Sequence, residues 1–168
     1  LKMDFRGLKT LTVLHDALNS IERSGHGRIH LEALSLDDEQ TFELFRQART
    51  SGVFQFESSG MKDVLRKVQP QSFLDIAALN ALYRPGPLKG GYFDEFIKLK
   101  HNKADAKLIF KEMEPILRET YGVVVYQEQV MKLASDIAGF SLGGADIMRR
   151  AMGKKKPEVM QALKKDFV

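Results

Sequence analysis

The chain has 168 residues, 43% of them hydrophobic, with a net charge of +4 and no cysteine. This composition suits one domain with a sizeable core rather than a disordered segment. It excludes disulfides and thiolate metal sites, in agreement with a cytoplasmic protein. No apolar run approaches the roughly 20 residues that span a bilayer, so we expect no membrane partner. Because the sequence opens at Leu1 without Met and closes inside a predicted helix, we interpret it as a piece of a longer protein.

The first predicted element is a short strand over residues 1–5, where apolar and polar residues alternate. Lys2 and Asp4 would lie on the same side of this strand. They suit a plain surface ion pair, and they also suit a phosphate contact beside a metal ligand. Residues 8–21 then carry apolar side chains at helical spacing, which predicts a helix that packs into the core.

A loop is predicted over residues 24–36, which contain two glycines. His26 and His30 are four residues apart, a spacing that binds metal on a helix, but the glycines argue against a helix here. We therefore predict that none of the four histidines is a metal ligand. Asp37 is placed to cap the next helix, and residues 53–56 predict a short strand.

The middle of the chain contains two further cap signals, Ser58 or Ser59 and then Ser72. The helix after Ser72 is expected to end at the sequence Tyr-Arg-Pro-Gly-Pro, residues 83–87, because proline stops a helix and fixes the backbone. Arg84 would then be held in place before any ligand arrives. The alternative is a surface arginine beside a connector.

The run Val-Val-Val-Tyr at residues 123–126 is rich in β-branched side chains and predicts a short buried strand. Further helices are predicted over residues 90–100, 114–119 and 127–138. The whole pattern predicts a mainly α fold with two or three very short strands, arranged as an irregular multi-helix domain.

The most basic stretch, residues 149–156, holds Arg149, Arg150 and three consecutive lysines beginning at Lys154, with no acid among them. Ser141 can cap the helix that leads to it. A buried stripe is predicted on this helix from the spacing of Ala145, Met148, Ala151 and Met152.

Two interpretations of this stretch remain open. A rigid arginine pair beside lysines suits a polyanion such as a triphosphate, because the arginine fork matches phosphate oxygens and lysine is a compact charge. Alternatively, Asp146 pairs with Arg149 or Arg150 and the lysines are merely solvated. In either case Gly153 can end the helix in a left-handed conformation, and Pro157 can begin the next helix.

Five motifs, in this order along the chain, resemble the alpha subunits of bacterial DNA polymerase III, the C-family replicative polymerases. The longest and most specific contains Phe-Ser-Leu-Gly-Gly-Ala-Asp-Ile-Met-Arg-Arg-Ala-Met-Gly-Lys-Lys-Lys-Pro. The motifs occupy residues 2–12, 52–61, 83–87, 120–131 and 139–158. Arg6 and Asn102 depart from the family pattern, where Leu and Gly are common.

The resemblance implies that residues 1–8 are the tail of a palm domain and that residues 9–168 are the first part of the fingers. Asp4 matches the third catalytic carboxylate of the family, and is therefore an expected metal ligand. Lys2 matches a lysine near the incoming triphosphate.

The resemblance also assigns nucleotide-binding roles in the fingers. Arg149 and Arg150 match residues that approach the triphosphate, and Lys154 adjoins them. Arg84 matches the Tyr-Arg-Pro-Gly-Pro motif, in which it would contact the nucleotide or the template.

The implied function is template-directed DNA synthesis, in which a dNTP is joined to a primer 3′-hydroxyl with the help of Mg²⁺. The implied partners are primer–template DNA, the incoming dNTP, other replicase subunits and the sliding clamp. With one catalytic carboxylate, the isolated chain is expected to be inactive. The alternatives are a non-catalytic basic helical module that binds nucleic acid or phosphate, and a purely structural helical domain.

Overall fold

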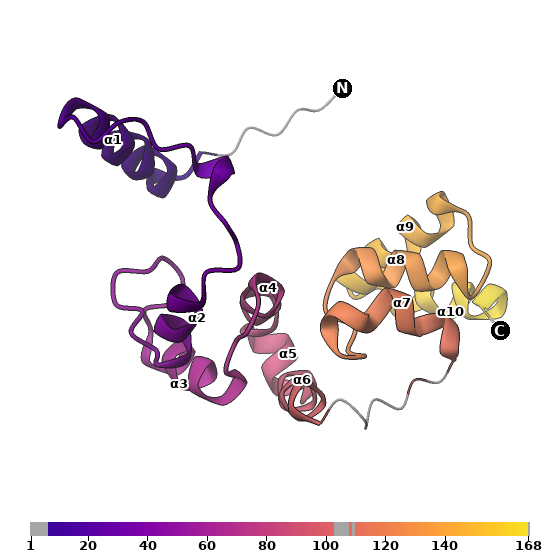
Figure 1. The fold of residues 1–168 in the computed structure, drawn as a ribbon. Helices are drawn as coiled ribbons and strands as arrows, with labels where there is room; N and C mark the ends of the chain where they lie inside the picture. The colour runs from indigo at the N-terminus through magenta and orange to yellow at the C-terminus, as the bar shows by residue number, and fades with distance from the viewer. Residues whose placement is uncertain (1–6, 103–107, 109, 168) are drawn as a thin grey trace.

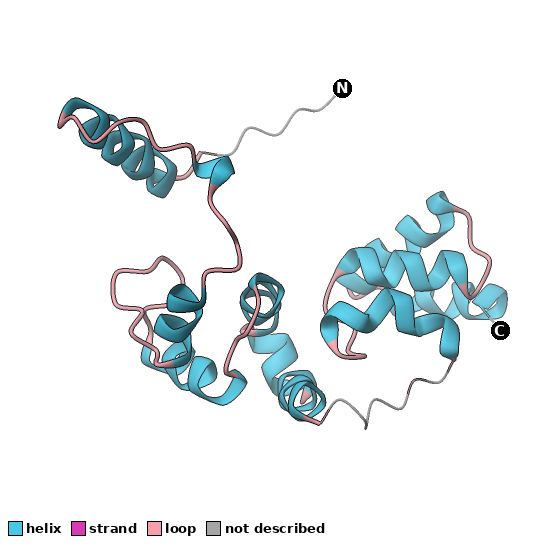
Figure 2. Cartoon of the chain, in the orientation of Figure 1, coloured by secondary structure: helices cyan, strands magenta, loops and turns pink. Residues whose placement is uncertain are grey.

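The structure is a computed structural model that describes residues 7–102, 108 and 110–167. The described part of the chain is built of helices (Figures 1 and 2). The α-helices are α1 (Lys9–Arg23), α2 (Glu39–Arg46), α3 (Ser59–Val68), α4 (Phe73–Leu82), α5 (Pro85–Lys89), α6 (Tyr92–His101), α7 (Glu114–Leu117), α8 (Gln127–Asp136), α9 (Leu142–Gly153) and α10 (Pro157–Phe167). Single 3-10 turns are η1 (Leu31–Ala33), η3 (Lys111–Met113) and η4 (Arg118–Thr120). The prediction of a mainly α fold is confirmed.

The predicted short strands do not form among the described residues. Residues 53–56 make turns, because the N–H groups of Val53 and Phe56 each bond a carbonyl three residues earlier, at 3.1 and 3.0 Å. The strand predicted over residues 1–5 lies outside the described part of the chain.

Residues 123–125 have no regular secondary structure and Tyr126 is extended, with no strand beside them in the described structure. The side chain of Gln129 replaces that strand, since its Oε1 accepts the N–H groups of Val125 at 2.8 Å and Tyr126 at 3.0 Å. A strand needs a neighbour for its backbone groups, which β-branched composition does not supply. The strand prediction was therefore wrong here.

The larger hydrophobic core lies among α2, α3, α4 and α6. Helix α3 buries Met61, Val64, Leu65 and Val68, which recur three and four residues apart and so face one side of the helix. The aromatic rings of Phe45 and Phe56 meet edge to face, with centroids 5.2 Å apart. The other buried members are Ala48, Ala78, Leu79, Leu82, Phe93, Phe96, Leu99 and Val123.

A second, smaller core holds α8, α9 and α10 together. Ala134, Ala145 and Met148 are its buried centre, and the two alanines let α8 and α9 approach closely. Partly buried side chains surround it, namely Val130, Met131, Phe140, Met160 and Leu163. The predicted stripe on α9 is confirmed except for Met152, which is exposed.

Helix α1 forms as predicted, but none of its residues is buried. Leu11 and Leu14 are 59% and 43% exposed. Figure 1 shows α1 and the loop that follows it set apart from α2–α6. The prediction that this helix packs into the core was wrong for the chain as described. Periodicity places apolar residues on one face without specifying what covers that face.

Side-chain caps begin several helices at or beside the predicted positions. Ser58 and Ser72 accept the N–H groups of Met61 and Asp75, both at 3.2 Å. Asp38, rather than the predicted Asp37, caps α2 by accepting the Thr41 N–H at 2.8 Å. Each such cap is worth about 1 kcal/mol relative to alanine in exposed helices.

Candidate functional site

The basic cluster, defined as Arg149, Arg150, Lys154, Lys155 and Lys156, occupies the end of α9 and the turn before α10. Ser141 caps α9 as predicted, by accepting the Gly144 N–H at 3.2 Å. The prediction that Gly153 adopts the left-handed conformation was wrong.

That conformation belongs to Lys155 instead, with φ of 51°. The N–H groups of Lys155 and Lys156 bond the carbonyls of Met152 and Ala151, so the turn closes two residues later than expected. Pro157 is the first residue of α10, as predicted.

Both arginines of the cluster pair with Asp146, which lies one turn earlier on α9. Arg149 directs its Nε and Nη2 to Asp146 Oδ1, at 2.9 and 2.7 Å. Arg150 Nη2 lies 2.6 Å from the other oxygen, Oδ2. The ion pairing considered as an alternative in the sequence is thus present, and it engages both arginines at once.

The two guanidinium groups differ in how many N–H groups remain free to bind a ligand. Arg149 also donates from Nη1 to Gln127 Oε1 at 2.8 Å, and its side chain is 28% exposed. The Arg150 side chain is 65% exposed, and within the described structure its one bonded partner is Asp146. A guanidinium has five N–H groups, so most of those on Arg150 remain available to a ligand.

Gln127 reaches Arg149 because the start of α8 is itself fixed. Two residues on, the Gln129 side chain is buried and bonds Thr120 Oγ1 at 2.8 Å and the Ile116 carbonyl at 3.3 Å. Its Oε1 takes the two backbone N–H groups described above. The sequence showed Gln127 and Gln129 only as a polar helix start, because their partners come from other segments.

The remaining members of the cluster, Lys154, Lys155 and Lys156, are all exposed. They leave a concentration of positive charge in the turn that follows Arg150. The Arg149 hydrogen bond, and then the charges of both arginines, lower the pKa of Asp146 below its ordinary value. Asp146 is therefore ionised at neutral pH and offsets part of the local charge.

Arg84 lies elsewhere in the fold. It precedes α5 in extended conformation, its side chain is exposed, and Pro85 occupies the first position of that short helix. The prolines thus begin a helix rather than only ending one, as the fixed φ of proline permits. Figure 1 shows α5 beside α4 and α6, apart from the group of α8, α9 and α10, so Arg84 does not join the basic cluster in this structure.

The residue before Arg84 explains one glycine of the sequence motifs. A Cβ added at Gly60, in the first turn of α3, would lie 2.1 Å from the hydroxyl oxygen of Tyr83. Two motifs that are separate in the sequence, Ser-Ser-Gly-Met and Tyr-Arg-Pro-Gly-Pro, therefore pack against each other. This contact positions the backbone beside Arg84.

Lys2 and Asp4, the predicted phosphate contact and catalytic carboxylate, lie outside the described residues. Within the described part, no group of three or more His, Asp or Glu side chains could hold a metal ion. The described residues do not by themselves form the carboxylate site that Mg²⁺ requires. We therefore assign no Mg²⁺ chemistry to them.

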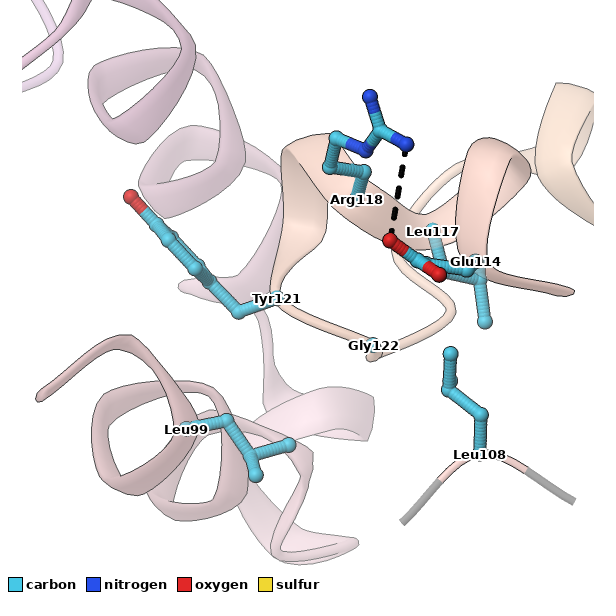
Figure 3. A pocket seen from close by; sticks show the side chains of 7 residues that line it. All are labelled: Leu99, Leu108, Glu114, Leu117, Arg118, Tyr121 and Gly122. Carbon is cyan, nitrogen blue, oxygen red and sulfur yellow. Dashed lines mark ion pairs between the residues drawn. The ribbon is translucent and has the colours of Figure 1, made fainter. Parts of the chain in front are cut away.

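A cavity of about 260 Å³ lies between α6 and the α7–η4 segment (Figure 3). Leu99, Leu108 and Leu117 make it mainly apolar, and the Glu114–Arg118 ion pair lies at its edge. None of its lining residues comes from α9, so it is separate from the basic cluster. None of the described helices is long and apolar enough to cross a membrane.

A buried polar cluster that the sequence did not predict lies beside the larger core. Asp75 on α4 and Lys100 on α6 form an ion pair at 3.1 Å, and the two side chains are 1% and 3% exposed. The Tyr121 hydroxyl donates to Asp75 Oδ1 at 2.8 Å, and the Gln71 N–H donates to Oδ2 at 2.8 Å. Tyr121 thereby attaches the segment that leads into α8 to the core of α4 and α6.

Comparison with known proteins defines the class to which this helical domain belongs. Residues 10–168 match the family described as the bacterial DNA polymerase III alpha subunit finger domain. The chain belongs to this family.

The curated relatives are longer proteins with the same name. The chain is 51% identical over 169 residues to DNA polymerase III subunit alpha of Aquifex aeolicus, with all of the chain covered. It is 50% identical to the protein of that name from Haemophilus influenzae and 45% identical to that from Escherichia coli K12, with 95% of the chain covered. In each case the chain spans 14% of the relative's length.

Proposed function

We propose that residues 9–168 are the first part of the fingers of a template-directed DNA polymerase and that residues 1–8 end its palm. The reaction joins a dNTP to a primer 3′-hydroxyl and releases pyrophosphate. The role of this segment is to bind the triphosphate of the incoming dNTP through Arg149, Arg150 and Lys154. The observation that carries the proposal is the exposed Arg150 fork, fixed on α9 by Asp146 beside three exposed lysines.

The chemistry of the reaction favours this arrangement. Negative charge grows on the leaving pyrophosphate, and positioned cations stabilise it more than mobile ones because they need no rearrangement during the reaction. Arginine matches phosphate oxygens with paired N–H groups, whereas lysine adds a point charge. A helix-mounted arginine with adjacent lysines provides both.

The other proposed roles rest on the resemblance of the motifs. Asp4 is the proposed catalytic carboxylate and Mg²⁺ ligand, and Lys2 and Arg84 are proposed nucleotide contacts. The proposed partners are primer–template DNA, other replicase subunits and the sliding clamp, in the cytoplasm. Asn in place of Asp4 is expected to abolish synthesis by the full-length protein without unfolding it.

Single-nucleotide incorporation at saturating primer–template tests the triphosphate role in the full-length polymerase that carries this chain. Removing one positioned, charge-assisted contact costs about 1.5–3 kcal/mol, so Arg150→Ala and Arg149→Ala should each lower kcat/KM for the nucleotide roughly 10- to 150-fold. Lys155→Ala should do much less, since its side chain is exposed and it keeps no fixed partner within the described structure. Loss of DNA affinity with normal nucleotide kcat/KM would instead assign the arginines to the DNA backbone.

A second candidate applies to the 168-residue chain alone: a non-catalytic basic module that binds nucleic acid or phosphate. The same exposed lysines favour it. Binding of primer–template that weakens steeply with salt, without any nucleotide incorporation, is the expected behaviour of such a module. Template-dependent extension by the chain alone would contradict it.

A further inference from the structure

The two adjacent arginines of α9 are not equivalent in the structure. Arg149 makes three hydrogen bonds, from Nε, Nη1 and Nη2, and it bridges α9 to the start of α8. Arg150 makes one ion pair, to Asp146, and its side chain is 65% exposed against 28% for Arg149. An arginine whose three nitrogens are all engaged has little left to offer a phosphate, whereas Arg150 keeps most of its donors.

Asp146 connects these two side chains because it gives one oxygen to each. Oδ1 receives Arg149 and Oδ2 receives Arg150, so the carboxylate plane is set by the first arginine and orients the second. If Arg149 were released, Asp146 could rotate and carry the Arg150 fork with it. The contact of Arg149 with Oδ1 therefore positions the Arg150 guanidinium that is paired with Oδ2.

Arg149 is held in turn by Gln127, which is exposed and lies two residues before the buried Gln129 at the start of α8. Gln127 is 22 residues from Arg149, so this bond depends on the packing of α8 against α9 rather than on helix spacing. The start of α8 is fixed because the buried Gln129 binds four groups through its amide, including Thr120 Oγ1 and the Ile116 carbonyl. Hydrogen bonds thus link Gln127 to Arg149, and Arg149 to Asp146, which also pairs with Arg150; the backbone of α8 connects Gln127 to the buried Gln129.

We infer that Gln127, Arg149 and Asp146 are positioning residues, and that Arg150 is the arginine that contacts the triphosphate. This inference rests on the proposed function and narrows it: Arg150 contacts the triphosphate, whereas Arg149, which the proposed function counts among the contacts, acts by holding Asp146 in place. Gln127 acts through Arg149 and Asp146, and it does not itself touch the nucleotide.

The test is a pair of substitutions in the full-length polymerase, measured by single-nucleotide incorporation with primer–template affinity and melting temperature recorded for each variant. Gln127→Leu removes the acceptor oxygen and should lower nucleotide kcat/KM roughly 3- to 30-fold, less than Arg150→Ala, because this bond acts on Arg150 only through Arg149 and Asp146. Gln127→Glu keeps an acceptor oxygen and should retain most of the activity. Gln161→Leu, the same change at an exposed glutamine of α10, should leave incorporation unchanged.

The background of the substitution separates positioning from other effects. In an Arg150→Ala protein, Gln127→Leu should lower nucleotide kcat/KM by less than about twofold, because residues that act through one group are not additive. An equal loss in both backgrounds would show that Gln127 does not act through Arg150, and would overturn the inference. So would a normal Gln127→Leu enzyme.

A second variant covers the case in which Gln127→Leu lowers the melting temperature. Arg149→Lys keeps the charge but cannot reproduce three fork-shaped bonds, so it should show the Gln127→Leu defect, whereas Arg150→Lys should retain part of its nucleotide binding. If Arg149→Lys instead retained part of its nucleotide binding and Arg150→Lys showed the Gln127→Leu defect, Arg149 would be the triphosphate contact and the inference would be overturned. If Arg150→Ala itself incorporates nucleotide normally, the proposed function fails together with this inference. If only the Gln127 and Arg149 predictions fail, the inference fails and the proposed function stands.

Discussion

Asp75 and Asp146 each bind more than one donor, yet they lie in opposite environments. Asp75 is 1% exposed and pairs with Lys100, which is 3% exposed, whereas the side chain of Asp146 is 28% exposed and pairs with an arginine that is 65% exposed. Both carboxylates lie on a helix and use both oxygens. They differ in whether water can replace a lost partner.

This difference separates structural from functional ion pairs in the chain. A buried charge that loses its partner has no substitute, so the Asp75 cluster is committed to holding α4, α6 and the Tyr121 segment together. Around Asp146, water can solvate whatever a ligand displaces, so a phosphate can compete for Arg150 at small cost. An exposed carboxylate can therefore keep an arginine oriented without withholding it from a substrate.

The largest effect should come from breaking the buried pair. Lys100→Met leaves the Asp75 charge buried and unneutralised, and should lower the free energy of unfolding of the chain by about 3–5 kcal/mol. Urea unfolding measures this directly. Lys98→Met is the matched control, because Lys98 is exposed on the same helix, and it should change stability by less than about 0.5 kcal/mol.

A double variant sharpens the same comparison. Replacing Asp75 as well, by Asn, removes the stranded charge and should recover part of the loss seen in Lys100→Met. If Lys100→Met is as mild as Lys98→Met, burial of the pair does not govern its contribution, and the contrast with Asp146 fails.

A smaller effect is expected at Tyr121, whose hydroxyl donates to Asp75 at 2.8 Å. Tyr121→Phe keeps the ring that lies against Phe96 and removes only this bond, so the expected cost is about 1.5–3 kcal/mol. Tyr126→Phe is the control, since the bond to Asp75 comes from Tyr121 and not from Tyr126. Equal effects of the two substitutions would show that the bond to Asp75 is not the cause of the stability loss in Tyr121→Phe.

The pH dependence of the Tyr121 contribution has a definite sign. Burial, and then the bond to Asp75 and its charge, raise the pKa of Tyr121 above its ordinary value of 10.0. The neutral hydroxyl is therefore favoured in the folded state. Its contribution is complete below pH 10.0 and falls as pH rises above that value, so the wild-type chain and Tyr121→Phe should converge in stability in alkali.

Local signals predicted much of the fold and part of the site. Ser141 marked the start of α9 and Pro157 the start of α10, and helical spacing placed Asp146 within reach of Arg149 and Arg150. Such features depend on residues within one or two turns of each other. The sequence alone therefore contains them.

The remaining features depend on contacts between distant segments. Tyr121 meets Asp75 across 46 residues and Gln127 meets Arg149 across 22, and no pattern of spacing shows such pairs. Nothing in the sequence around Lys100 indicates its burial, because lysine is rarely buried without a partner and its partner lies on another helix. The left-handed turn shifted from Gly153 to Lys155 because the packing of α10 on α9 sets where the chain reverses.

The smallest effect on stability is expected at Asp146, where water and salt weaken the pairing. Arg149, through its hydrogen bond, and then Arg150 lower the pKa of this carboxyl, so its contribution is present above the ordinary value of 3.8 and disappears as pH falls through the lower folded value. Asp146→Asn should therefore melt slightly earlier than wild type at neutral pH. The two should melt alike once Asp146 is protonated in acid, and added salt should shrink the neutral-pH difference because exposed charges are screened.

Carboxyl NMR can follow the titration of Asp146 itself: its pKa should lie below 3.8 in wild type and rise toward 3.8 in Arg149→Ala. An unchanged titration in Arg149→Ala would mean that Asp146 is not held by Arg149, and would remove the link through which Gln127 is proposed to orient Arg150.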